Sequence, residues 1–193
     1  MGKVVVTEFV SLDGVFEDPG GSEGSRHGAW TFQFDRGSDG DRFKLDELMA
    51  AEVQLLGRVT YEGFAAAWPS IQDEVGFAER MNGMPKYVVS TTLRDPEWNN
   101  STVIPGNVPE EVAKLRERTS GDILIAGSGQ LVRALTRHDL VDEYRLMVFP
   151  VILGSGKRLF ADGDEDLTRL TLAESKQVGP DGVLALTYRR ASS

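Results

Sequence analysis

The sequence predicts an α/β fold: a three-layer sandwich with a mostly parallel central sheet and a C-terminal antiparallel β-hairpin. Two observations carry this prediction. Short apolar, β-branched runs alternate with helical patterns up to about Val148, which is typical of parallel strands joined by helices. Two longer strand-like segments follow, joined by the turn sequence Gly-Pro-Asp-Gly at 179–182, which indicates a hairpin. Because no internal repeat or linker interrupts the 193 residues, we expect one domain over 1–193.

The first strand is predicted over Lys3–Val10, whose almost continuous apolar run is typical of a strand buried on both faces. Residues 17–41 form a segment rich in Gly, Ser, Asp and Glu that is too long for an ordinary connection. Loops of this kind usually bind ligands, close over them or are disordered. Trp30, Phe32 and Phe34 alternate within the segment, which argues against disorder.

The later elements follow from helical periodicity, from strand-like apolar runs and from the Gly and Pro residues that separate them. Helices are expected over Asp41–Glu52, Val59–Ala67, Gln72–Met81, Pro109–Arg118 and Leu131–His138. Strands are expected over Val53–Gly57, Lys86–Ser90, Ser101–Ile104, Asp122–Gly127, Asp142–Val148, Leu167–Val178 and Gly182–Arg190.

The composition limits the classes of function. Hydrophobic residues make up 40%, charged residues make up 26%, and the formal net charge is −9. We therefore expect no nucleic-acid partner, because duplex binders normally present a net basic surface. The chain has no cysteine, which excludes disulfides, thiolate nucleophiles and cysteine metal sites. The sequence shows no signal peptide and no apolar run long enough to span a bilayer, so we expect a cytoplasmic protein without a membrane partner.

Four strand ends hold the residues that could carry chemistry, because ligands of open α/β sheets bind at the carboxyl ends of the strands. These ends are Ser11-Leu12-Asp13-Gly14, Gly57-Arg58-Val59-Thr60, Ser90-Thr91-Thr92 with Arg94, and Gly127-Ser128-Gly129. Glycine lets a phosphate approach the backbone, and a helix start offers free N–H groups. Arg58 and Arg94 could add charge-assisted bonds. Two glycine-bearing helix starts with nearby cations suit a dinucleotide better than a mononucleotide.

Other nucleotide-binding, metal-binding and catalytic motifs have little support in the sequence. Gly127-x-Gly129 lacks the third glycine of the Rossmann fingerprint. The segment 154–157 reads Gly-Ser-Gly-Lys like part of a P-loop, but Arg158 stands where Ser or Thr is required. His27 and His138 have no metal-ligand spacing, so no metal site is expected. A hydrolase triad has no support, because the sequence contains no G-x-S-x-G motif.

With these strand ends in view, the chain resembles the dihydrofolate reductase-like superfamily. It is most similar to the reductase domain of the riboflavin-biosynthesis deaminase–reductase and its stand-alone bacterial relatives. The segments SLDG, GRVTYE, VVST, AGSGQLV and FPVILGSGKRLF occur in the order of that branch, over roughly Val4 to Phe160. The resemblance implies an NADPH-dependent reductase acting on a planar nitrogen heterocycle, either a ribosylated aminopyrimidine or a pterin-like acceptor. It also implies a homodimer, and the mostly apolar segments Arg145–Leu153 and Leu184–Tyr188 could pair or pack across a two-fold axis.

The resemblance also implies the roles of the cofactor residues. The first glycine turn matches the family segment that binds the pyrophosphate and the adenosine-ribose phosphate, the Ser-Thr segment lies near the same ribose phosphate, and the second glycine turn lies over the pyrophosphate. With Arg94 as an additional cation, the expected NADPH-binding residues are Gly57, Arg58, Thr60, Ser90, Thr91, Arg94, Gly127, Ser128 and Gly129.

The substrate side leaves more alternatives open. Asp13 matches the aspartate near the nicotinamide and the substrate, and we expect it to be the catalytic polar group; otherwise it is a turn-forming Asp-Gly. Trp30 and Phe32 would cover a flat ring, or they belong to a loop folded onto the core. Asp41, with Asp46 as the alternative, is the candidate carboxylate for holding the heterocycle.

The chain also departs from the family pattern. Its second glycine turn reads Gly-Ser-Gly where dihydrofolate reductases carry consecutive glycines, and it has no deaminase signature. Two further hypotheses therefore stay open. One is a non-catalytic nucleotide-binding or regulatory protein on the same fold, and the other is a structural dimer module with a vestigial site.

Overall fold

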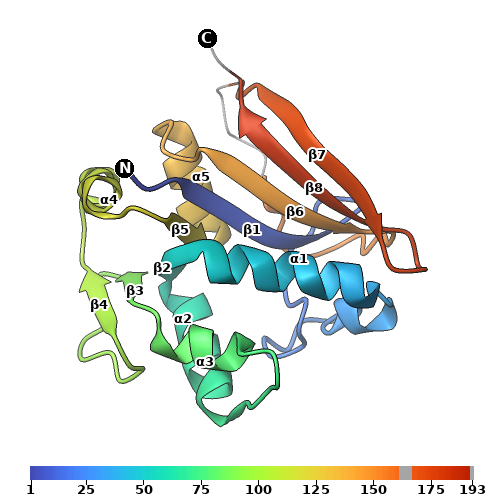
Figure 1. The fold of residues 1–193 in the computed structure, drawn as a ribbon, viewed down its shortest axis with the longest axis horizontal. Coiled ribbons are helices and arrows are strands. Elements are labelled where there is room, and N and C mark those ends of the chain that lie inside the picture. Colours follow the sequence, from blue (N-terminus) through green and yellow to red (C-terminus); the bar gives the residue numbers. More distant parts are fainter. Residues whose placement is uncertain (161–166, 192–193) are drawn as a thin grey trace.

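The computed structural model describes residues 1–160 and 167–191, and it confirms the predicted α/β architecture (Figure 1). Within these residues one eight-stranded sheet has the order β4-β3-β2-β5-β1-β6-β8-β7. Its strands are β1 Val4–Ser11, β2 Ala51–Gly57, β3 Lys86–Val89, β4 Ser101–Ile104, β5 Asp122–Ile125, β6 Glu143–Phe149, β7 Leu170–Val178 and β8 Val183–Arg190. The strands β1 to β6 run parallel, and β8 runs antiparallel to both β6 and β7. The predicted C-terminal hairpin therefore forms the end of the sheet farthest from β4.

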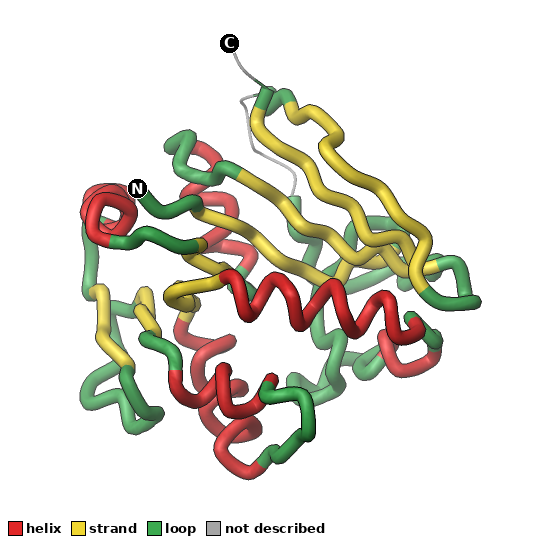
Figure 2. Tube along the Cα trace, viewed as in Figure 1, coloured by secondary structure: helices red, strands yellow, loops and turns green. Residues whose placement is uncertain are grey.

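Helices cover both faces of the sheet (Figure 2). The helices α1 Gly37–Ala50, α2 Arg58–Ala67 and α3 Phe77–Gly83 pack on one face, and α4 Val108–Arg118 and α5 Gly129–Arg137 pack on the other. Two short 3-10 helices, η1 Trp30–Gln33 and η2 Trp68–Ser70, lie in the connections. None of the helices in the described ranges is long and apolar enough to cross a membrane.

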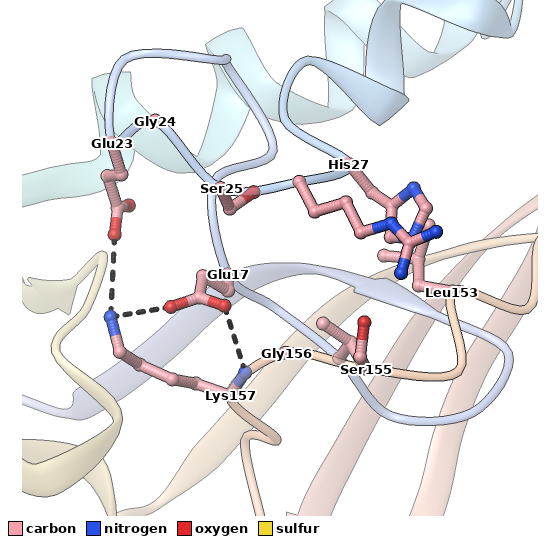
Figure 3. A pocket seen from close by; sticks show the side chains of 11 residues that line it. Glu17, Glu23, Gly24, Ser25, His27, Leu153, Ser155, Gly156 and Lys157 are labelled. Carbon is pink, nitrogen blue, oxygen red and sulfur yellow. Dashed lines mark hydrogen bonds and ion pairs between the residues drawn. The ribbon is translucent and has the colours of Figure 1, made fainter.

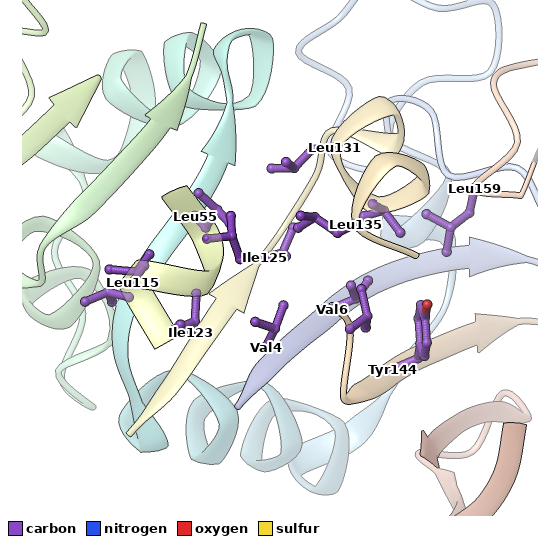
Figure 4. Close-up of a cluster of buried hydrophobic side chains, with 14 of the residues drawn as sticks. Val4, Val6, Leu55, Leu115, Ile123, Ile125, Leu131, Leu135, Tyr144 and Leu159 are labelled. Carbon is purple, nitrogen blue, oxygen red and sulfur yellow. The ribbon is translucent and has the colours of Figure 1, made fainter. Parts of the chain in front are cut away.

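Strand β1 is buried on both faces, as its apolar run predicts. Val4 and Val6 join a cluster with Leu115 of α4 and Leu135 of α5 (Figure 4). Val5 points to the opposite face and joins the cluster that contains residues of α1, α2 and α3. Because successive side chains of a strand alternate between faces, a one-residue slip would move each set into the cluster on the opposite face. The different packing partners on the two faces therefore fix the register of β1 and, with it, the places of the neighbouring strand ends.

A third cluster lies between β6 and the segment that precedes α1. Phe149 of β6 is fully buried, and its ring meets those of Phe9, Trp30 and Phe34 edge-on, at centroid distances of 5.7, 5.4 and 5.7 Å. Edge-to-face pairs of this kind stabilise a core beyond their buried area. The aromatic residues of the long loop therefore anchor it to the sheet.

One helix begins later than its sequence pattern predicts. A helix is expected over Gln72–Met81, but α3 spans Phe77–Gly83. Gly76 has a left-handed φ of 81°, and the carboxylate of Asp73 accepts hydrogen bonds from the N–H groups of Phe77 and Ala78 at 2.9 and 2.6 Å. An acid that accepts the free N–H groups of a first helical turn sets the helix start, so the prediction was wrong about where this helix begins.

Candidate functional site

The carboxyl ends of three neighbouring strands bring Ser90, Gly57 and Gly127 into one row. Gly57 pairs with Val89, the residue before Ser90, between β2 and β3. On the other side of β2, the Gly57 N–H group donates to the Gly127 carbonyl at 3.4 Å. Three of the four strand ends that the sequence singled out are therefore neighbours.

The two glycine turns abut so closely that neither position has room for a side chain. A Cβ atom at Gly57 would come within 2.5 Å of Ser128 Oγ, and one at Gly127 would come within 2.6 Å of Thr60 Oγ1. Gly127 also has a φ of 83°, which L side chains rarely adopt. Larger residues at these two positions would push the turns apart.

Each turn leads directly into a helix. Gly57 precedes the first residue of α2, and Ser128 precedes the first residue of α5. The first N–H groups of a helix have no intrahelical acceptor and carry positive potential. Two such helix starts beside each other form a place where the backbone could bind the pyrophosphate of a dinucleotide.

The cations and hydroxyls beside the turns are accessible to different degrees. Arg58 is exposed and forms a bidentate pair with Glu62 at 2.9 and 2.8 Å. Arg94 and Thr91 are also exposed. The Ser90 hydroxyl accepts hydrogen bonds from Thr92 and Leu93 N–H at 3.1 and 2.9 Å. Because an exposed pair stabilises a protein little, a bound phosphate could draw Arg58 away from Glu62 at small cost.

Asp13 lies in the first loop, directly after β1, and contacts the loop after β6. Its Oδ1 atom accepts hydrogen bonds from Ser11 Oγ at 2.7 Å and Leu153 N–H at 3.1 Å, and its Oδ2 atom accepts one from Gly154 N–H at 2.9 Å. The Ser11 hydroxyl, followed by the two backbone groups, lowers the pKa of Asp13 to about 2 despite partial burial. Asp13 is therefore ionised at neutral pH and ties two loops together, while its catalytic role stays a prediction.

The substrate candidates occupy different environments. Trp30 is 1% exposed and its indole N–H donates to the Glu17 carbonyl at 2.9 Å, so the structure favours the alternative in which this residue belongs to the core. Phe32 is 78% exposed and is free to contact a ligand. Asp41 is exposed on α1 and pairs with Arg36 at 2.7 Å, and Asp46 is also exposed.

A pocket of about 320 Å³ lies between the long loop and the loop after β6 (Figure 3). Its polar lining includes Arg26 and His27 from the long loop and Ser155 and Lys157 from the loop after β6. Lys157 Nζ pairs with Glu17 at 2.7 Å. Sequence reasoning used the loop around Lys157 for the family resemblance and rejected it as a P-loop, but it assigned no site residue there, although its glycines and cation were the available signal.

Glu8 on β1 is a second residue that sequence reasoning did not single out. Its side chain is buried, and its Oε1 atom has no hydrogen-bond partner among the described residues. Burial raises the pKa of Glu8 to about 8, although the Lys44 ammonium and a hydrogen bond from the Gly127 backbone oppose the shift. The available signal was an acid within the otherwise apolar run of the first strand. Among the described residues, no group of three or more His, Cys, Asp or Glu side chains could hold a metal ion.

Comparison with known proteins identifies relatives of the whole chain. The chain is 30% identical to the uncharacterized protein YwjB of Bacillus subtilis over 191 residues, which cover 98% of both chains. Its fold is similar to that of a putative riboflavin biosynthesis protein from Shewanella sp. PV-4, with a TM-score of 0.78, 20% identity and coverage of 98% and 99% of the two chains.

The fold is also similar to that of dihydrofolate reductase from Enterococcus faecalis, solved in complex with NADP(H), with a TM-score of 0.63, 16% identity and coverage of 99% and 98%. These likenesses confirm the dihydrofolate reductase-like fold. Residues 2–184 match the family described as the RibD C-terminal domain. The chain therefore belongs to the RibD C-terminal domain family.

Proposed function

We propose that this protein is an NADPH-dependent reductase that acts on a planar nitrogen heterocycle, either a ribosylated aminopyrimidine or a pterin-like acceptor. The observation that carries the proposal is the row of Ser90, Gly57 and Gly127, in which two abutting glycine turns open two helices. Membership of the RibD C-terminal domain family supports it. The dihydrofolate reductase of similar fold was solved with NADP(H), which supports the choice of cofactor.

In this proposal each part of NADPH would contact a different part of the row. The turns at Gly57 and Gly127 would hold the pyrophosphate through the N–H groups of α2 and α5. Arg58, Arg94 and the hydroxyls beside them would hold the ribose phosphate, because a phosphate is best bound by cations and hydrogen-bond donors. When bound, the nicotinamide supplies the hydride, and the protein's part is to orient it and to exclude competing reactions.

The acceptor would lie beyond the pyrophosphate end of this row, near the first loop. The exposed ring of Phe32 and the carboxylates of Asp41 and Asp13 are the groups proposed to contact or orient it. The pocket between the two loops, at about 320 Å³, is at the lower end of the range of small-molecule sites. We include in the proposal that the protein works as a cytoplasmic homodimer of single-domain chains.

Titration of NADPH and NADH into the wild type and into Arg58→Ala tests the cofactor assignment. The variant should lose about 1.5–3 kcal/mol of NADPH affinity, the scale of a hydrogen bond to a charged group, and much less NADH affinity. Arg118→Ala removes the same charge at the far end of α4 and should change neither affinity. Equal losses for both cofactors in Arg58→Ala would refute recognition of the ribose phosphate by this residue.

Steady oxidation of NADPH in the presence of a pterin or pyrimidine acceptor would separate a reductase from a nucleotide-binding protein without turnover. If no nicotinamide nucleotide binds at all, the remaining hypothesis is a structural dimer module.

A further inference from the structure

Glu8 extends the row of cofactor residues by one strand. Val6 of β1 pairs with Ile125 of β5, so the same register continued by two residues brings Glu8 beside Gly127, whose backbone acts to lower the pKa of Glu8. Neighbouring strands lie about 4.8 Å apart. In sheet order the row therefore runs Ser90, Gly57, Gly127 and Glu8, from β3 through β2 and β5 to β1.

The order of the row indicates which part of the cofactor would meet Glu8. If the ribose phosphate is held at β3 and β2 and the pyrophosphate at β2 and β5, the chain of the dinucleotide continues toward β1. The nicotinamide then lies at the strand that carries Glu8. This step rests on the proposed function.

The charged groups that act on Glu8 come from two elements, α1 and the loop that precedes it. On α1, Lys44 Nζ donates to Thr7 Oγ1 at 2.5 Å and pairs with Glu47, and the Glu47 Oε2 atom has no partner among the described residues. The loop between β1 and α1 contributes Glu23. On β6 the residue opposite Glu8 is the apolar Leu146, and Arg133 of α5 bonds the carbonyls of Arg158 and Leu159.

These surroundings only partly compensate the negative charge of an ionised Glu8. The residue is 9% exposed, and the nearby Lys44 ammonium also pairs with Glu47. Burial therefore outweighs the effect of Lys44, and the pKa of Glu8 is raised to about 8, so the free protein holds a proton on this group at neutral pH. A buried polar atom without a partner is costly to the fold, which suggests that Oε1 meets a ligand.

We infer that Glu8 is a proton-exchanging group beside the nicotinamide ring, which keeps its proton when NADPH is bound and releases it when NADP⁺ is bound. The reduced ring is uncharged, so it leaves a buried carboxylic acid in its favoured neutral form. The oxidised ring carries one positive charge, and an opposite charge within a few ångströms favours the carboxylate. The proton that leaves Glu8 passes to solvent on binding. During turnover it is available to the acceptor atom that receives the displaced electron pair.

The test is the pH dependence of the two dissociation constants, measured by titration of NADP⁺ and of NADPH into the full-length protein between about pH 6 and pH 9. As the pH rises toward the pKa of Glu8, the NADP⁺ dissociation constant should fall by up to about tenfold per pH unit. The NADPH dissociation constant should stay nearly constant over the same range. Both cofactors carry the same phosphates, so the ratio of the two constants reports the ring alone. Calorimetry in buffers of different ionisation enthalpy should show close to one proton released per NADP⁺ at neutral pH, and none per NADPH.

Two variants test whether the released proton comes from Glu8. In Glu8→Gln the ratio should become independent of pH and the proton release should vanish, with NADPH affinity kept. Glu23→Gln, a matched change of another acid that acts on Glu8, should retain both the pH dependence of the ratio and the proton release. If Glu8→Gln does not fold, ¹³C NMR of the glutamate carboxyls in the wild type replaces it: one signal titrating near pH 8 in the free protein should move well below that value with NADP⁺ and not with NADPH.

The outcomes are distinguishable. A constant ratio in the wild type, or proton release that persists in Glu8→Gln, overturns the role of Glu8 while leaving the proposed reductase intact. Failure of both nucleotides to bind at every pH overturns the proposed function, and the role of Glu8 with it.

Discussion

Asp13 accepts hydrogen bonds from Ser11, Leu153 and Gly154, so an acid that the sequence places at a strand end also joins the first loop to the loop after β6. Its lowered pKa means that it carries charge, not a proton, across the neutral range. If the nicotinamide binds near the first loop as proposed, this fixed negative charge would orient the acceptor or polarise a water molecule.

We predict that Asp13→Asn changes NADPH affinity less than about threefold, while turnover falls at least tenfold, or about 1.4 kcal/mol on the barrier. Asparagine keeps the size of the side chain and can still accept from Ser11 and Leu153, but it removes the charge and cannot accept at both ends. Fluorescence titration of NADPH beside single-turnover oxidation with an acceptor found by screening would measure the two effects.

Urea unfolding of the same variant would tell a purely structural role from a catalytic one. A loss of stability with unchanged turnover would leave Asp13 as a loop tie, and the polar role would pass to Asp41, Asp46 or solvent. The native-state stabilisation by Asp13 should itself disappear as pH falls from about 3.8 to about 2, because the folded-state pKa is the lower one.

At the scale of residues, the sequence predicts best where the backbone itself imposes the residue type. Gly57 and Gly127 were recognisable because each ends a predicted strand that a predicted helix follows. Trp30 was ambiguous, because its burial depends on Phe149, more than a hundred residues away. Glu8 gave only a weak signal, since its unusual state arises from Lys44, Glu47 and Gly127, which the sequence does not place beside it.

At the scale of elements, strands were predictable because apolar β-branched runs leave few alternatives. Strand β4 matches its expected bounds Ser101–Ile104, and β1 and β2 differ from theirs by one or two residues. Helix α3 was misplaced because Asp73 and Gly76 set its start through capping and a left-handed turn. The conformation of the long loop could not be predicted, since side-chain acceptors determine it instead of a periodic pattern.

One of those acceptors is Asp18, which is 1% exposed. Its two carboxylate oxygens accept hydrogen bonds from the N–H groups of Glu23 and Ser25, both at 2.9 Å. Burial alone would raise the pKa of Asp18, but these hydrogen bonds outweigh it and lower the pKa. The charged form therefore closes the loop that lines the pocket.

We predict that Asp18→Asn raises amide hydrogen exchange at residues 20–28 by at least about tenfold, or ~1.4 kcal/mol of local stability, because one of its two acceptor atoms becomes a donor. Exchange in α4 should not change, and Asp46→Asn, an exposed acid on α1, serves as the control. In the wild type the protection should be lost as pH falls through the lowered pKa of Asp18. Unaltered exchange in the variant would mean that other contacts hold the loop.

At the scale of the whole molecule, the hairpin end of the sheet differs from the rest. Strand β7 lies at the edge and is exposed along nearly its whole length. Leu172 and Leu184 are 49% and 41% exposed. Leu172 of β7 lies opposite Tyr188 of β8, and Leu184 lies four residues before Tyr188 on β8, so both leucines are on the same face of the sheet. Exposed apolar side chains on an open sheet end are suited to an isologous contact between two copies of the chain.

We predict a homodimer, with light scattering at micromolar concentration giving twice the chain mass of 21.2 kDa. Leu172→Glu should shift the protein to the monomer, because two copies of a new charge would be buried against each other across the axis. Val75→Glu changes an apolar residue that is 62% exposed away from the hairpin and should leave the dimer intact. A wild type that is monomeric under these conditions would contradict the prediction.

The most direct measurement of the central claim is a ¹H–¹⁵N spectrum recorded as NADPH is added, because glycine amides appear in a region of their own. Binding across the two turns predicts saturable shifts for the amides of Gly57, Gly127 and Gly129. The amides of Gly83, Gly106 and Gly121, which lie outside the two turns, should stay in place. Saturable binding with shifts confined to other residues, or an unchanged spectrum at high NADPH concentration, would contradict the proposed cofactor site.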